Sequence, residues 1–139
     1  DIASWGKGRV SLEGDLERVA KARGRSYSPD PNLEAGFFYR ADHFAFARLG
    51  VPAITIGPGL DKLDGGVEAG RALREKYFAD CYHQACDAWT PGWDPSGHAA
   101  DTLLVYDLGA ELANSRRWPT WEKDSEFRAA RDKSEAARR

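Results

Sequence analysis

The sequence contains no methionine at any of its 139 positions, not even the first. A translation start is therefore missing, and we expect the chain to be a fragment or a processed piece of a longer polypeptide. It has only two cysteines, too few for a disulfide framework, and no apolar run close to the roughly 20 residues that span a bilayer. Because any leader peptide would precede the first residue, the sequence leaves the cellular compartment open.

An excess of charge of one sign is also missing. The 20 Lys and Arg residues nearly balance the 22 Asp and Glu residues, for a net charge of −2. This balance gives no indication of a nucleic-acid partner or of an anionic membrane surface. The hydrophobic fraction of 42% and the charged fraction of 30% are typical of one globular domain with its own core. Helical and strand-like segments alternate, which indicates an α/β fold.

Two segments near the start of the chain have clear patterns. Residues 11–23 predict an amphipathic helix, with Ser11 as its N-cap and Gly24 at the left-handed position that follows it. Residues 36–40 are short and aromatic, and they are compatible with a strand. The apolar face of the helix consists of Leu12, Leu16, Val19 and Ala20.

The middle of the chain predicts a short helix followed by a strand. Residues 42–49 can form one or two helical turns, with Asp42 as the cap and with Phe46 and Leu49 facing inward. Residues 51–56 form a continuous apolar run, which is typical of a buried strand in an α/β sheet. Such a strand needs neighbours on both sides, and the chain supplies few other strands.

In the second half of the chain, the glycines, prolines and leucines indicate the secondary structure. Residues 60–75 are rich in glycine and charge and predict a long surface loop. Asp94 followed by Pro95 is a strong helix start, and that helix should run to about Asn114. Residues 123–139 are charged and alanine-rich, which indicates a peripheral helix or tail. The apolar stripe of the long helix consists of Leu104, Leu108 and Leu112.

His83 is the first candidate for chemistry. It lies between Tyr82 and Asp87 in a non-helical stretch, and loops commonly carry metal-binding and catalytic residues. A neutral imidazole can bind zinc, and an acid four residues on can orient it. The simpler alternative is a hydrogen-bonded histidine in a loop. Cys81 and Cys86 bracket His83, but the three together fall short of the four ligands of structural zinc, so we expect buried thiols.

A second candidate segment begins some 40 residues earlier. Asp42 and His43 precede Gly50-Val51-Pro52-Ala53, the start of the predicted strand. Tyr39 and Arg40 lie directly upstream and can line a substrate pocket, because an arginine clamps a peptide carboxylate well. The alternative is that Asp42 only caps a helix and that His43 is a surface residue.

In this order the two segments resemble the C-terminal half of the M28 family of zinc aminopeptidases, and the resemblance extends over nearly the whole chain. The family pattern Tyr-His-x-x-x-Asp matches residues 82–87, and Asp-His-x-x-Phe before Gly-Val-Pro-Ala matches residues 42–53. The departures are Ala41 where serine is usual, Ala85 where proline is common and Ala88 where an acid is common.

The resemblance implies the zinc-dependent exopeptidase fold, which has three α/β/α layers around a mixed central sheet. Residues 1–139 would be the incomplete C-terminal portion of that domain. It also implies two zinc ions in the complete domain, hydrolysis of the N-terminal bond of a peptide substrate, and a secreted or periplasmic location. His83 would be the last zinc ligand, and the residues beside the metal or in the substrate pocket would be Asp42, Tyr39, Arg40, His43, Tyr82 and Asp87.

The other motifs of that family, His-x-Asp and an adjacent Glu-Glu pair, are absent from this sequence. No catalytic residue is therefore assigned here. A catalytic zinc needs about three protein ligands, and one histidine cannot hold it alone. We expect the isolated chain to be inactive, to need the missing N-terminal half, and to self-associate through an exposed apolar edge. The alternatives are a non-catalytic peptidase-like domain for binding or assembly, and a glutaminyl-cyclase-like acyltransferase.

Overall fold

A small mixed sheet lies at the centre of the molecule. The computed structural model describes residues 1–6 and 9–138. Strand β1 (Ile2–Trp5) is the middle strand, parallel to β2 (Tyr27–Ser28) and antiparallel to β3 (Thr55–Pro58). The sheet order is β2-β1-β3, so the predicted α/β class is confirmed.

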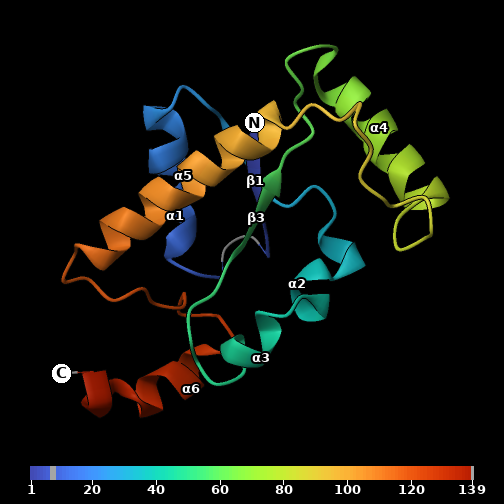
Figure 1. Cartoon of the computed structure of the whole chain (residues 1–139). Helices are drawn as coiled ribbons and strands as arrows, with labels where there is room; N and C mark the ends of the chain where they lie inside the picture. The colour runs from blue at the N-terminus through green and yellow to red at the C-terminus, as the bar shows by residue number, and fades with distance from the viewer. Residues whose placement is uncertain (7–8, 139) are drawn as a thin grey trace.

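Helices account for most of the remaining regular structure (Figure 1). None of those among the described residues is both long and apolar enough to cross a membrane. The α-helices are α1 (Leu12–Ala22), α2 (Phe37–Arg40), α3 (Phe44–Ala47), α4 (Gly66–Asp80), α5 (Ser96–Ala113) and α6 (Arg128–Lys133), and the two 3-10 helices are η1 (Leu33–Ala35) and η2 (Glu135–Arg138).

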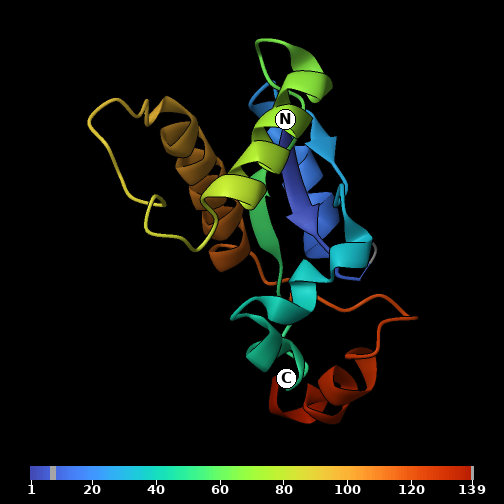
Figure 2. The same cartoon turned by 90° about the vertical axis from the view of Figure 1, so that its right-hand side faces the viewer.

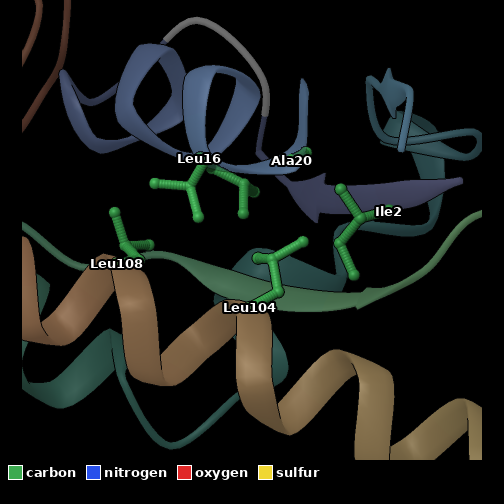
Figure 3. Packing of buried hydrophobic residues seen from close by; sticks show 6 residues of the cluster. Ile2, Leu16, Ala20, Leu104 and Leu108 are labelled. Carbon is green, nitrogen blue, oxygen red and sulfur yellow. The ribbon is translucent and has the colours of Figure 1, made fainter. Parts of the chain in front are cut away.

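Helices α1 and α5 enclose the first core cluster with the sheet. Leu16 on α1 and Leu104 on α5 are both fully buried, and their side chains meet Ile2 of β1 (Figure 3). Salt bridges flank this contact at the surface, for example Arg23 with Asp107 at 2.5 Å. Burial of these aliphatic side chains is the main force that holds the two helices on the sheet.

A second core cluster joins α2 and α3 to the end of the chain. Trp121 is fully buried against Phe38 and Phe127, with ring centroids 6.3 and 4.9 Å apart. Its indole N–H donates to the Gly50 carbonyl at 3.1 Å. Gly50 has φ +83°, and a Cβ there would lie 2.6 Å from the Ala130 carbonyl carbon. The segment around α6 therefore packs directly on the turn after α3.

Helix α4 lies on the other side of the sheet from α1 (Figure 2). Trp5 at the end of β1 contacts Phe37 of α2 at 5.3 Å between ring centroids. Phe37 in turn contacts Phe78 of α4 at 5.6 Å. Aromatic rings thus hold helix α4 against the sheet, since each ring covers a large apolar area.

Two of the predicted helices are confirmed. The helix predicted over residues 11–23 is α1, and the helix predicted from Asp94 is α5. Asp94 accepts hydrogen bonds from the Ser96 backbone N–H and hydroxyl, both at 2.9 Å. Ser11 occupies the N-cap position of α1 as predicted, but its side chain forms no capping hydrogen bond. Its hydroxyl accepts from the Thr120 N–H at 2.9 Å instead.

Several predictions for the middle of the chain are wrong. Residues 37–40 form helix α2 rather than part of a strand. Residues 60–75 were predicted to be a loop, but helix α4 begins at Gly66 and continues to Asp80. The predicted strand begins later, at Thr55, and reaches Pro58. Phe46 and Leu49 are 60% and 73% exposed, because Ala47 is the residue of this short helix that faces the core.

Candidate functional site

His83 lies in a tight loop directly after α4. A disulfide between Cys81 and Cys86 closes this loop, so the expectation of two buried thiols was wrong. His83 has φ +59°, a conformation that side chains other than glycine rarely adopt. Asp87 holds it there: its carboxylate accepts from the His83 backbone N–H at 3.4 Å and from the Tyr77 hydroxyl at 2.9 Å. The loop therefore fixes the backbone of its histidine.

The imidazole of His83 is exposed and stacks on Tyr82. The two ring centroids are 3.9 Å apart and the planes are tilted by 20°. Among the described residues, no side chain or backbone group forms a hydrogen bond with either ring nitrogen. Asp87 contacts the histidine through its backbone and leaves the ring nitrogens available to an outside ligand.

An apolar pocket of about 330 Å³ opens beside this loop. It is lined by the end of β1, by the segment after β3 and by one side of α4. Tyr82 links pocket and loop, because it lines the pocket and also packs on Phe78 with ring centroids 4.5 Å apart. The apolar lining consists mainly of Trp5, Leu60, Leu73, Tyr77, Phe78 and Tyr82.

His43 lies in a different environment from His83. It is half-buried, its ring stands edge-on to Phe38 at 4.6 Å, and its Nδ1 is 2.7 Å from the Thr55 hydroxyl. Its buried Nε2 has no hydrogen-bond partner among the described residues. Burial lowers the pKa of His43, and the nearby charge of Asp42 opposes that shift without cancelling it. Asp42 itself is exposed and does not cap α3.

This lowered pKa gives a pH prediction. In the unfolded chain His43 regains its ordinary pKa of about 6.5, so acid favours the unfolded state, which takes up the proton more readily. Stability should be complete above about pH 6.5 and fall as the pH drops through the lowered folded pKa. Urea unfolding between pH 7.5 and pH 5 should show a smaller acid loss in His43→Gln. Asp42→Asn should enlarge the loss, and equal slopes in all three proteins would contradict the prediction.

Tyr39 and Arg40 point in different directions from α2. The Tyr39 hydroxyl donates to Glu126 at 2.6 Å, and this bond raises the pKa of Tyr39, with burial adding to the effect. Arg9 completes the cluster with an ion pair to Glu126 at 3.2 Å. Tyr39 is thus tied to the C-terminal segment. The Arg40 guanidinium lies over the Phe37 ring, 5.4 Å from its centroid.

The candidate residues thus fall into two groups. Tyr82, His83 and Asp87 gather on the loop after α4, while Tyr39 and His43 pack around Phe38. The aromatic residues between the groups, Trp5, Phe37, Tyr77 and Phe78, were missed by the sequence analysis. Recognition of a helix over residues 66–80 would have placed Tyr77 and Phe78 one turn before the His83 loop.

These residues do not hold a zinc ion by themselves. Among the described residues, no group of three or more His, Cys, Asp and Glu side chains could bind a metal. The two cysteines are oxidised to a disulfide and Asp87 bonds a backbone N–H, which leaves His83 alone. We therefore derive no reaction step through a metal from this chain.

Comparison with known sequences identifies the class of protein. The sequence model of Peptidase family M28 matches residues 1–106, which include β1 to β3, α4 and the His83 loop. The chain therefore belongs to peptidase family M28, a family of hydrolases that are generally zinc-dependent. A search of curated proteins and a search of solved structures each found no match.

Proposed function

We propose that the chain is the C-terminal part of an M28 zinc aminopeptidase domain, to which it supplies His83 as one metal ligand. The exposed imidazole with both nitrogens unbonded among the described residues, on a loop braced by a disulfide and by Asp87, carries this proposal. A rigid backbone lowers the entropic cost of ordering a ligand when metal binds. Tyr82 orients the ring by stacking, and the adjacent apolar pocket takes a side chain of the peptide substrate.

Other ligands and the general base would come from a part of the domain outside this chain. Two observations support this. Strand β3 pairs with β1 along one edge, and no strand among the described residues pairs along its other edge. Helix α5 carries Leu103, Val105 and Tyr106, which are 45–69% exposed, and exposed apolar side chains gathered on one element often mark a surface that another segment covers. The chain alone is accordingly expected to be inactive and to self-associate through this surface.

The test uses the full-length polypeptide that contains these residues. His83→Ala should lower bound zinc, measured by elemental analysis, and reduce hydrolysis of leucine p-nitroanilide by at least about 100-fold. Mutation of a group that only orients a metal ligand lowers metal affinity or activity by about 10–100-fold, and loss of the ligand itself should lower it at least as much. His98→Ala is the matched control, because His98 is exposed on α5. Wild-type zinc content and turnover in His83→Ala would contradict the proposal.

A non-catalytic binding domain is the second candidate. The lack of a metal-binding group among the described residues favours it. The same measurements on the wild-type full-length protein separate the two functions. If the domain only binds a partner, that protein should contain no zinc and should not hydrolyse the substrate.

A further inference from the structure

A second pocket lies beside Phe78, next to the apolar pocket of the His83 loop. Its volume is about 470 Å³, and it is open between α4 and the segment that leads into α2. Phe37 and Phe78 provide its apolar surface, while Arg71 and Arg74 on α4 provide its positive charge. The pocket shares Leu60, Arg74 and Phe78 with the apolar pocket beside Tyr82. The two pockets therefore form neighbouring parts of one surface.

Arg71 and Arg74 line this pocket, and Arg40 packs on Phe37, another residue of its lining. These arginines differ from most others in the molecule. Arg18, Arg23 and Arg25 each pair with a carboxylate at 2.5–2.7 Å. No carboxylate among the described residues lies within ion-pairing distance of Arg40, Arg71 or Arg74. The guanidinium groups of these three arginines therefore keep their hydrogen-bonding capacity for a ligand.

Aromatic rings hold two of these guanidinium groups in place. Arg74 lies 5.8 Å from the centroid of Phe37 and 5.6 Å from that of Phe78, and Arg40 lies 5.4 Å from the centroid of Phe37. A guanidinium packed on a ring loses little further freedom when it binds, and its planar N–H groups can grip a carboxylate with two bonds. Of the described residues that line the pocket, Glu75 is the one acid, against two arginines.

We propose that this pocket, which we call the arginine pocket, binds a carboxylate of the peptide substrate. The inference deepens the proposed function and rests on it. A peptide would place an apolar side chain in the pocket beside Tyr82 and a negative charge at Arg74, with Arg40 and Arg71 contributing to the positive field. The carboxylate can be the C-terminus of a short peptide or an acidic side chain.

The spacing of the rings limits the length of that peptide. From the imidazole of His83 the path runs 3.9 Å to Tyr82, 4.5 Å to Phe78 and 5.6 Å to the Arg74 guanidinium. An extended peptide spans about 3.5 Å per residue. A chain of roughly two to four residues therefore reaches from the histidine to the arginine pocket, so the substrates are short peptides or peptides with an acid near the N-terminus.

The test measures binding rather than turnover, on the full-length polypeptide kept metal-free with a chelator. Calorimetry compares Leu-Gly-Gly, its C-terminal amide, and Leu-Gly-Asp-amide. The free acid should bind at least about tenfold more tightly than the amide, because a charged hydrogen-bonding pair is lost with the carboxylate. If Leu-Gly-Asp-amide regains that affinity, a side chain can supply the carboxylate; if it does not, the C-terminus supplies it. Both results support the proposal.

The variants assign the effect to the arginine pocket. Arg74→Gln should reduce the acid-to-amide ratio to less than about threefold, and Arg40→Gln should reduce it in part. Lys76→Gln is the matched control, because Lys76 is a cation of α4 that already pairs with Asp80 at 2.5 Å. Circular dichroism confirms that each variant is folded. His83→Ala should keep the ratio, so failure of this proposal can be told apart from failure of the proposed function.

Three results would overturn the proposal. Equal binding of the free acid and the amide by the wild-type protein would show that the pocket ignores the carboxylate. A ratio that survives in Arg74→Gln, in Arg71→Gln and in Arg40→Gln would place the carboxylate elsewhere. No measurable binding of any of the three peptides would show that this surface does not bind short peptides.

Discussion

Trp121→Ala is expected to lower the free energy of unfolding by about 3–5 kcal/mol, as for other large aromatic residues removed from a core. Trp121 is fully buried and is the largest fully buried side chain among the described residues. Its removal leaves a cavity between Phe38 and Phe127 and takes the hydrogen-bond donor from the Gly50 carbonyl. A buried acceptor without a partner adds to the cost of the cavity.

Trp118 provides the matched control for this prediction. It lies three residues earlier and is 60% exposed, with the Arg131 guanidinium 5.9 Å from its ring centroid. Trp118→Ala should change stability by no more than about 1 kcal/mol, since surface substitutions rarely cost more. Urea unfolding followed by circular dichroism avoids the loss of a fluorophore. Similar losses in both variants would show that the second core cluster does not depend on Trp121.

Leu104→Ala is expected to cost about 2–5 kcal/mol, the range for a leucine removed from a packed interior. Leu104 is fully buried where α5 meets Leu16 of α1 and Ile2 of β1 (Figure 3). The rigid sheet and the salt bridges between the two helices hinder collapse into the cavity, so the cost should lie in the upper part of the range. Leu104→Ala should therefore lower the free energy of unfolding about as much as Trp121→Ala does.

Leu103 is the neighbouring control on the same helix. It is 52% exposed, so Leu103→Ala removes the same atoms from a position that faces outward. The stability change should stay below about 1 kcal/mol in the isolated chain. A cost near that of Leu104→Ala in the full-length polypeptide would instead show that another segment covers this face of α5. Midpoints of urea unfolding in the two polypeptides give the comparison.

The two core clusters make the C-terminal segment part of the same structural unit as the matched family region. Ile54 and Leu112 pack against both clusters and so connect them. Val10 forms a β-bridge with Trp121, and Glu122 N–H donates to the Arg9 carbonyl at 2.8 Å. Residues beyond 106 thus pack directly on elements of the matched family region.

Local pattern was enough to predict α1 and α5. Leu16 and Val19 on α1, like Leu104 and Leu108 on α5, recur at helical spacing and face the same core. The motif around His83 was also visible in the residue order, and family M28 membership followed from it. These features depend on residues close together in the sequence, so their signals do not need the rest of the fold.

Helix α4 could not be read from its local pattern, and its tertiary contacts explain why. Gly65 and Gly66 suggest a loop, but both adopt positive φ at the start of the helix. Gly70 permits a close approach, since a Cβ there would overlap the backbone of Leu60. Phe78 contributes a ring that packs on α2. Packing against distant residues outweighs the weak helical propensity of glycine.

The sequence by itself determined the family, the α/β class and the candidate histidine, because each depends on short patterns of residue type. Only the tertiary structure decided which side chains surround that histidine. The Cys81–Cys86 disulfide and the bond from His83 N–H to Asp87 depend on the backbone turn. The pairing of Tyr39 with Glu126 joins residues 87 positions apart. The arginine pocket exists because Phe37 and Phe78, from separate helices, meet across the sheet end, and a contact of that kind follows from packing rather than from spacing in the chain.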